Sequence, residues 1–313
     1  MATQHQLYAS PETVHWGFFD GSLRPVLEVN SGDRITFHCV SGEPEDMPED
    51  PSRILPELHD IHLRSERGPG PHILTGPVWV RGAEKGDTLQ VNILEVSLRQ
   101  DWGWNLIMPG RGTLPEDFTV ERRLIVPLDR KAMVGRLPWG KYLPLKPFFG
   151  VMGVAPPAKF GRVPSFAPGV HGGNMDNREL VAGTTLFLPV WNDGALFSAG
   201  DGHAVQGEGE VCLTAIETAL SGTFELTVRK DLSIGFPRAE TATHYMTMGM
   251  SPDLDDAAKQ AVREMISLLG SLAGLSREDA YSFCSLALEL RVTQLVDGDK
   301  GIHAMIAKQL LSG

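Results

Sequence analysis

A recurring glycine turn between apolar strands is the feature that most restricts the fold of this chain. Segments 26–40, 82–94 and 179–189 each place a Gly before an Asp or Thr and then a run with apolar residues at alternate positions. Such alternation is typical of strands with one buried face. Irregular spacing excludes a solenoid repeat. The turn at 31–33, between two apolar runs, also indicates a hairpin. The pattern predicts a mainly β fold, with a double-layered, jelly-roll-like body.

Helical periodicity is confined to the C-terminal third. Ser251 and Pro252 are typical of an N-cap and first helical residue, and apolar residues then recur at helical spacing from 254 to 269. Ser276, followed by acidic residues, predicts the start of a second helix that runs to about Leu288. This part of the chain is therefore expected to form a smaller α+β lobe.

Four strands are predicted to supply the sheet of that lobe. Segments 291–296 and 301–306 flank an Asp-Gly-Asp-Lys turn, and segments 224–229 and 242–250 precede the helices. The resulting division is a β-rich body over residues 1–223 and an α+β lobe over residues 224–313. A single intertwined domain remains an alternative.

Residues 41–71 have a different composition. Their first part is acidic and rich in Pro, with Glu43, Asp46, Glu49 and Asp50 among its charged residues. Such a segment buries too little apolar surface to form a core, which predicts a surface loop. A lid over an active site is the alternative, because long loops in compact domains are often functional.

Potential metal ligands and general bases gather between residues 170 and 217 on a Gly-rich background. They are His171, Asp176, Asp201, His203, Glu208 and Glu210. In extended chain, residues two apart point to the same face. Asp201 with His203, and Glu208 with Glu210, are therefore expected to project into one pocket. A cluster of this kind between apolar strands indicates a functional site rather than a solvated loop.

The same stretch resembles the acetamidase/formamidase family of amide hydrolases. The resemblance is carried by HGGNMD (171–176), AGTTLFLPV (182–190) and GALFSAGDGHAVQGEGEV (194–211). Four further segments resemble the family in the same order along the chain, namely 14–33, 68–89, 147–156 and 289–308. The resemblance implies hydrolysis of a small neutral amide, such as formamide, acetamide or a γ-lactam. Glu208 departs from it, because an Asp is expected there.

Among the chemical solutions to amide hydrolysis, a metal-activated water fits the cluster best. Zinc accepts His nitrogen and carboxylate oxygen, and it activates a bound water. Asp201 and His203 are the expected ligand pair, completed by Asp176 or Glu210. Either Glu208 or Glu210 is expected to act as the general base. A second divalent ion, such as Ca²⁺, in addition to zinc stays an open alternative.

Three histidines outside that ligand set remain candidates. His171 is ambiguous between ligand, outer hydrogen-bond donor and oxyanion donor, and we group it with the catalytic candidates. His72, in a Gly-Pro-Gly-Pro-His segment, and His15, beside Trp16, are candidates of second rank. A lone His is more often a hydrogen-bonded structural residue.

Two alternatives compete with a metal-dependent hydrolase. The first is a Cys-dependent amidase that uses Cys212, the thiol nearest the cluster, although that residue lies in an apolar strand and lacks a visible cationic neighbour. The second is a non-catalytic β-sandwich binding protein with a structural Ca²⁺ ion. His ligands argue against this second alternative, because Ca²⁺ takes oxygen ligands.

Charge and hydropathy limit the partners. The formal net charge of −11 argues against a nucleic-acid partner. The sequence has no signal-peptide pattern and no apolar run of membrane-spanning length, which predicts a cytoplasmic protein without a membrane partner. A homodimer is expected because two-fold pairs are the commonest oligomers.

Overall fold

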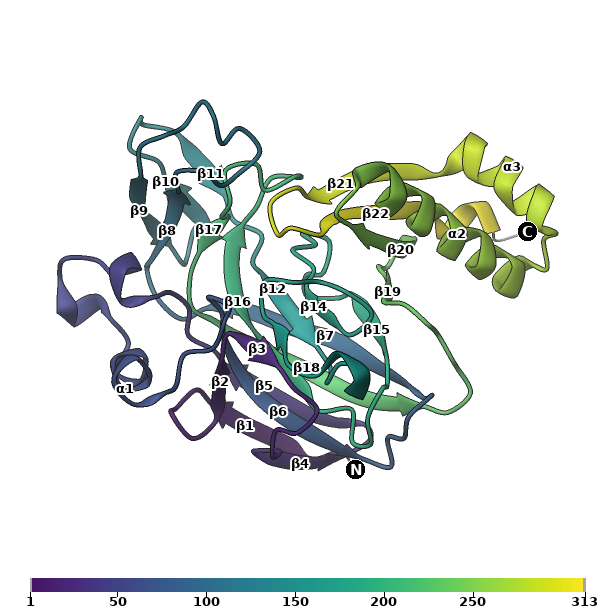
Figure 1. Ribbon diagram of the computed structural model, residues 1–313, viewed down its shortest axis with the longest axis horizontal. Helices are drawn as coiled ribbons and strands as arrows, with labels where there is room; N and C mark the ends of the chain where they lie inside the picture. The colour runs from purple at the N-terminus through teal and green to yellow at the C-terminus, as the bar shows by residue number, and fades with distance from the viewer. Residues whose placement is uncertain (1, 312–313) are drawn as a thin grey trace.

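The computed structural model describes residues 2–311, and its strands form two large sheets in that range (Figure 1). The first sheet has the order β1 (Gln4–Tyr8), β5 (Asp33–His38), β18 (Leu220–Arg229), β7 (Thr88–Leu98), β15 (Thr185–Pro189), β19 (Arg238–Glu240), β20 (His244–Ser251), β22 (Lys300–Ala307) and β21 (Glu289–Gln294). It therefore runs from the N-terminal strand into the C-terminal lobe.

The second sheet contains the strands that carry the candidate site. Its main path is β11 (Tyr142–Pro144), β10 (Val134–Arg136), β9 (Arg122–Asp129), β8 (Trp102–Ile107), β17 (Ile216–Glu217), β16 (Phe197–Val205), β12 (Phe148–Gly153) and β14 (Gly172–Asn174). Strand β6 (Ile73–Arg81) pairs with β16 and joins β2 (Val14–Trp16) and β4 (Leu27–Asn30) to it. A small separate sheet pairs β3 (Phe18–Phe19) with β13 (Val163–Pro164).

Aromatic side chains from both sheets meet in the main core. Phe37 and Phe224 of the first sheet contact Phe197 of the second edge-to-face, with ring centroids 5.8 Å apart in each pair. Phe149 of the second sheet contacts Phe224 at 5.4 Å. Each of these rings is almost completely buried. Burial of this much aromatic surface holds the layers together and confirms the predicted mainly β, double-layered body.

All three glycine turns carry the chain from the second sheet to the first. They connect β4 to β5, β6 to β7 and β14 to β15. The predicted hairpin at 31–33 is therefore wrong. Strand β4 pairs in parallel with β6, whereas β5 pairs in parallel with β1. The turn through Gly32, at φ 91°, arches between the layers instead of joining neighbours in one sheet.

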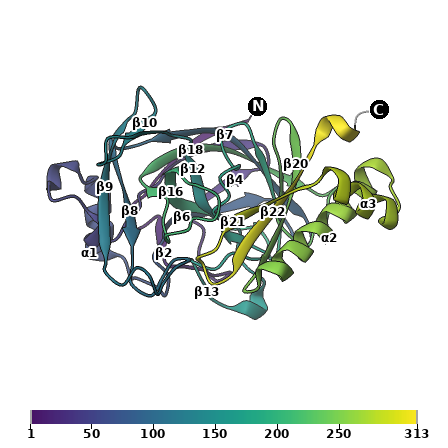
Figure 2. The same cartoon turned by 90° about the horizontal axis from the view of Figure 1, so that it is seen from above.

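In the C-terminal lobe the longer helix packs against β20 and β22, and the second helix packs mainly on the first (Figure 2). Helix α2 (Leu254–Ala273) buries Ala257, Ala261 and Met265 at helical spacing. The carbonyl of Ala257 approaches Gly249 of β20 so closely that a side chain there would collide with it. Small residues on both elements therefore allow the close contact between helix and sheet.

The helix starts follow their capping residues. Helix α3 (Arg277–Ala287) begins after Ser276, whose side chain accepts a hydrogen bond from Asp279 N, as predicted. Helix α2 starts two residues later than predicted, because the Asp253 carboxylate is its N-cap and accepts from Asp256 N. Short 3₁₀ turns occupy Pro44–Asp46, Pro51–Arg53, Ala158–Phe160 and Lys308–Leu311.

Two segments differ from their predicted places. The strand expected at 224–229 in the lobe is part of β18, which lies between β5 and β7 in the body. Its partners are far away in sequence, so its own pattern could not identify them. Residues 41–71 also contain helix α1 (Pro56–Arg64), which buries Leu58 and Ile61 against Trp16 and Val40. The division into a body over residues 1–223 and a lobe over residues 224–313 stays a prediction. A lid function of residues 41–71 also stays a prediction.

No helix within residues 2–311 is both long enough and apolar enough to cross a bilayer.

Candidate metal centre

The second sheet and its loops bring one buried histidine and several carboxylates together. Asp201 and His203 lie in β16, and Glu217 lies opposite His203 on the neighbouring strand β17. Asp176 follows β14, and Glu210 belongs to the turn after β16. All five side chains are at least nine-tenths buried. Residues from four segments of the chain therefore form one internal polar cluster.

His203 is at the centre of this cluster. Its Nε2 atom lies 3.2 Å from Asp201 Oδ2, 3.2 Å from Glu217 Oε2 and 3.7 Å from Asp176 Oδ1. Ligand atoms of Asp201, His203 and Glu217 lie within 4.8 Å of one another, and so do those of Asp176, His203 and Glu210. Of the sequence-predicted ligands, the structure brings all four, Asp176, Asp201, His203 and Glu210, to this point.

Two further residues at this cluster escaped the sequence analysis. Glu217 is a carboxylate within an apolar strand, a pattern that would have indicated a buried site residue. Asp297 comes from the turn between β21 and β22, and its carboxylate interacts with Asp176. His72, a second-rank candidate, does reach the cluster, since its Nε2 lies 3.7 Å from Asp201 Oδ2 while Ser165 Oγ contacts its Nδ1 at 3.1 Å.

The backbone is strained where it presents these carboxylates. Asp176, Asp201 and Glu210 have φ angles of 45°, 57° and 46°, in a region that side-chain-bearing residues rarely adopt. Gly150 of β12 faces the same space, and a Cβ there would collide with Asp176 Oδ1 and Asp201 Oδ2. Strain of this kind is maintained chiefly at functional sites. The fold thus reserves room for these side chains to converge.

The donor atoms fit a divalent cation. Among the described residues, Asp176 Oδ1 and Glu210 Oε2 are buried carboxylate oxygens without a hydrogen-bond partner, and Asp297 Oδ2 is a third. Buried carboxylates are normally paired or bound to metal. One imidazole nitrogen with several carboxylate oxygens is a ligand set that zinc accepts. The residues present therefore fit a metal centre.

The electrostatics of the cluster also favour a bound cation. Burial, followed by the charge of Asp176, raises the pKa of Glu210 well above its usual value. Burial raises the pKa of Glu217 to about 8. Burial alone would lower the pKa of His203, but the Glu217 and Asp201 carboxylates outweigh it and raise that pKa. The charges of the Glu210 and Glu217 carboxylates are thus poorly compensated by the protein itself, whereas His72 and His203 lower the pKa of Asp201.

Glu208 lies outside the cluster, contrary to the expectation that it shares a pocket with Glu210. Its side chain is 39% exposed and lies 3.7 Å from Arg291 Nη1. The chain at 207–210 is a turn rather than a strand, with Gly209 at φ 91°. The same-face rule for residues two apart therefore fails here.

Among the described residues, neither His171 nor His15 forms a hydrogen bond or ion pair with the cluster carboxylates, and His171 Nε2 is buried without a hydrogen-bond partner. The His171 ring contacts Phe19 edge-to-face at 5.0 Å. Both ring nitrogens of His15 are engaged, Nδ1 with Phe18 O at 2.6 Å and Nε2 with Ser198 Oγ at 2.8 Å. Burial lowers the pKa of each to about 4. Both rings are neutral near pH 7. The catalytic role of His171 and the second-rank site role of His15 stay predictions.

These two histidines are expected to destabilise the protein in acid. An unfolded His has a pKa of about 6.5, so the unfolded chain binds more protons between pH 6.5 and 4. Their effect on stability is absent above that range, grows as pH falls, and is complete near pH 4, at on the order of 3 kcal/mol for each residue. Urea unfolding at pH 7 and 4.5 should show a smaller loss of stability for His171→Asn than for wild type. Equal losses of stability in wild type and His171→Asn would contradict a lowered pKa of His171.

The cysteines have no catalytic setting. Burial raises the pKa of Cys39 to about 12 and also raises that of Cys284. The half-buried Cys212 Sγ lies 3.2 Å from the donating Asn105 Nδ2. We expect alkylation with iodoacetamide, verified by mass spectrometry, to leave amide hydrolysis nearly unchanged. Rapid inactivation that acetamide prevents would instead support the Cys-dependent alternative.

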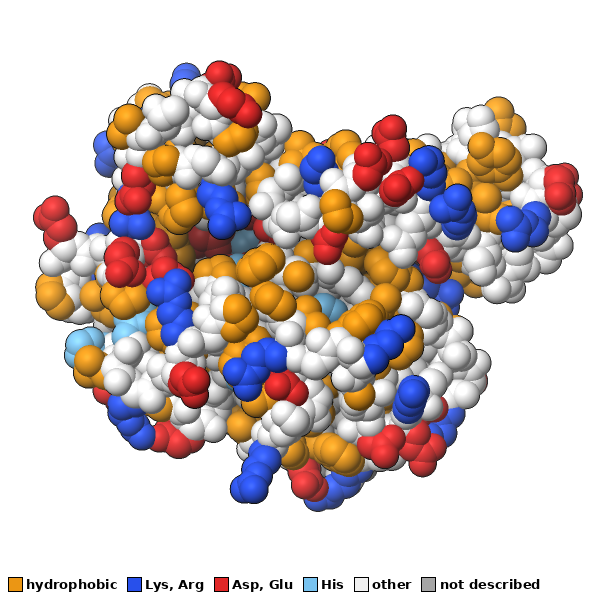
Figure 3. All heavy atoms as spheres, viewed as in Figure 1, with side chains coloured by type: hydrophobic (Ala, Val, Ile, Leu, Met, Phe, Trp, Pro, Cys, Tyr) orange, Lys and Arg blue, Asp and Glu red, His pale blue; other side chains and the backbone are white. Residues whose placement is uncertain are grey.

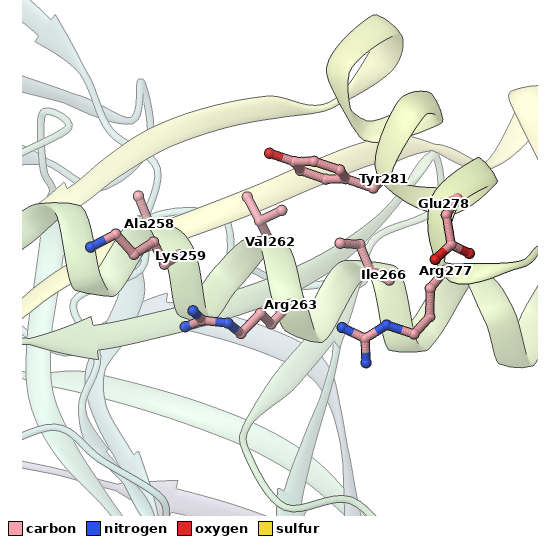
Figure 4. A pocket seen from close by; sticks show the side chains of 8 residues that line it. All are labelled: Ala258, Lys259, Val262, Arg263, Ile266, Arg277, Glu278 and Tyr281. Carbon is pink, nitrogen blue, oxygen red and sulfur yellow. The ribbon is translucent and has the colours of Figure 1, made fainter.

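A groove in the C-terminal lobe and a recess beside it differ in character. A groove of about 500 Å³ between α2 and α3 has Val262 and Ile266 facing Tyr281, with Lys259, Arg263 and Arg277 among its other lining residues (Figure 4). None of the cluster residues lines it. In Figure 3, a separate recess lies between the β8–β11 region and the C-terminal lobe, with acidic and histidine side chains in its depth. The groove is therefore not the candidate site.

Sequence comparison supports the family resemblance over most of the chain. The profile of the Acetamidase/Formamidase family matches residues 3–163 and 162–307. A formamidase of Methylophilus methylotrophus is 30% identical over 265 residues, which cover 68% of this chain and 61% of that protein. An acetamidase of Mycolicibacterium smegmatis is 27% identical over 199 residues, covering 45% of this chain and 49% of the other. The matches thus span less than two thirds of these relatives.

Structural comparison extends the similarity to the whole fold. A crystal structure of a recombinant predicted acetamidase/formamidase from Thermoanaerobacter tengcongensis superposes with a TM-score of 0.88 at 26% identity, over 99% of this chain and 98% of the other. A γ-lactamase from Delftia acidovorans shares the fold at 21% identity, with a TM-score of 0.65 over 99% of this chain and 94% of the other. With a family profile that matches nearly every described residue, this chain belongs to the acetamidase/formamidase family.

Proposed function

We propose that this protein hydrolyses a small neutral amide to a carboxylate and ammonia, with a divalent ion held by the His203 cluster. The observation that carries the proposal is the position of His203 Nε2, 3.2 Å from both Asp201 Oδ2 and Glu217 Oε2, beside buried carboxylate oxygens that have no hydrogen-bond partner within residues 2–311. Family membership and the similarity to a formamidase and an acetamidase support the reaction class.

Asp201, His203 and Glu217 are the proposed ligands. Glu217 suits this role because Ala215 N donates to its Oε1 at 2.8 Å, which fixes the carboxylate and leaves Oε2 towards His203. The nitrogen ligand favours zinc over Ca²⁺, which prefers oxygen. Such an ion would supply Lewis-acid polarisation of the amide carbonyl and a lower pKa for water.

Glu210 is the proposed general base and acid. Its Oε2 lacks a partner among the described residues, and burial raises its pKa, which makes the ionised carboxylate a stronger base than an exposed Glu. In the reaction Glu210 Oε2 would take a proton from the attacking water and deliver it to the departing nitrogen. This assignment replaces Glu208, which faces Arg291 at the surface.

The remaining residues of the cluster are proposed to help retain the ion and to orient the substrate. Asp176 lies 3.7 Å from His203 Nε2, and Asp297 lies beside Asp176, so both add negative charge that favours retention of the ion. His72 flanks Asp201 and is held by Ser165, at the edge of the cluster where its side chain is 15% exposed. This position suits a hydrogen bond to the substrate.

The test is ammonia release from formamide and acetamide, with a γ-lactam assayed in parallel for ring opening. Enzyme treated with a strong chelator, then reconstituted with zinc or with calcium, should regain activity with zinc alone. Full turnover by metal-free protein would refute the metal role, and failure on every amide would refute the reaction class. The predicted homodimer remains a prediction.

A further inference from the structure

Gln206 is a buried amide that connects the central histidine to two other parts of the chain. Gln206 is only 3% exposed. Gln206 Nε2 donates to Asp176 O at 2.8 Å and to Thr293 O at 3.4 Å. Its Oε1 lies 2.9 Å from His203 Nδ1. One amide thus contacts β16, the loop after β14 and strand β21.

These contacts fix the orientation of the amide. The carbonyl oxygens of Asp176 and Thr293 can only accept hydrogen bonds, so the amide atom beside them must be the NH₂ group. The atom that faces the imidazole is then Oε1, which can only accept. The donor in that contact must be His203, and its Nδ1 therefore carries a hydrogen.

A histidine that binds a metal ion does so as the neutral imidazole, which carries only one ring hydrogen. With that hydrogen on Nδ1, Nε2 has its lone pair free, and Nε2 is the atom that lies 3.2 Å from Asp201 Oδ2 and Glu217 Oε2. From this geometry we propose that Gln206 is a positioning residue that holds His203 in the Nδ1–H tautomer and directs Nε2 at the divalent ion. This inference rests on the proposed metal role of the cluster.

The same amide also positions Asp176. Because Gln206 bonds the backbone carbonyl of Asp176, it fixes the loop that brings this carboxylate to 3.7 Å from His203 Nε2. Outer partners of metal-binding histidines typically contribute 10–100-fold to metal affinity or activity. Loss of the Gln206 amide should therefore weaken zinc binding without removing any ligand.

The experiment compares zinc affinity by competition with a chromophoric chelator in three variants. Gln206→Leu should bind zinc about 10–100-fold more weakly than wild type. Gln206→Glu keeps an acceptor for Nδ1–H and should retain more affinity than Gln206→Leu. Gln100→Leu is the matched control, because Gln100 is also buried and donates to a backbone carbonyl, Trp102 O, at 3.1 Å. That variant should keep wild-type affinity.

The tautomer is measured directly on wild-type protein by NMR with ¹⁵N-labelled histidine. The zinc-loaded protein should show His203 with hydrogen on Nδ1 and zinc on Nε2. Because the measurement uses wild-type protein, it does not depend on whether a variant folds. Hydrogen on Nε2, or a Gln206→Leu variant with the affinity of Gln100→Leu, would overturn the positioning role alone. Wild-type protein that binds no zinc would overturn the proposed metal centre, and the inference with it.

Discussion

The His203→Ala variant is expected to lose bound zinc and amide hydrolysis together. Two groups of ligand atoms converge at the cluster, one with Asp176 and Glu210 and one with Asp201 and Glu217, and His203 supplies the nitrogen atom in each. Its Nε2 lies 3.2 Å from two carboxylate oxygens. Loss of an outer partner of such a ligand costs about 10–100-fold in metal affinity, so loss of the ligand itself should exceed about 100-fold. Zinc per chain, measured by mass spectrometry after dialysis, and ammonia release provide the two readouts.

The matched control is His171→Asn. His171 is equally buried but packs on Phe19, so this variant should keep its zinc and most of its activity. A His203→Ala protein with full zinc and a reduced rate would make His203 a proton carrier rather than a ligand. Normal zinc with a normal rate would remove it from the site.

The Glu210→Gln variant is expected to lose about 10²–10⁴-fold in kcat while it still binds zinc, because Gln keeps the shape of Glu and cannot carry the proton. The reason lies in Glu210 Oε2, which is buried, has no partner among the described residues, and belongs to a carboxyl group with a raised pKa. Steady-state ammonia release under saturating amide gives kcat, and bound zinc is measured on the same preparation.

Glu208→Gln supplies the control two positions away in the same turn. Its side chain faces Arg291 and is partly exposed, so the change should leave kcat near the wild-type value. Glu217→Gln should differ from both, since its loss as a ligand should lower zinc content as well as rate. A Glu210→Gln enzyme with wild-type turnover, or a large loss in Glu208→Gln, would contradict the assignment of the base.

Much of the architecture was predictable because it depends on local patterns. Alternating apolar residues after glycine turns specify strands with one buried face, and all three such turns cross between the two layers. Ser276 predicted the start of α3 because an N-cap acts on its own helix turn. The partners of β4 and β5 were not predictable, since each pairs with strands elsewhere in the chain.

The sequence by itself placed Asp176, Asp201, His203 and Glu210 in one Gly-rich stretch, and that density indicated a site. Tertiary structure decided which side chains meet. It brought in Glu217 through the pairing of β17 with β16, and Asp297 through the turn of the C-terminal lobe. It also separated Glu208 from Glu210, because the backbone turns at Gly209 and Glu210 instead of extending. Residue type is local, whereas convergence of ligand atoms within a few ångströms depends on strand pairing and backbone angles across the whole fold.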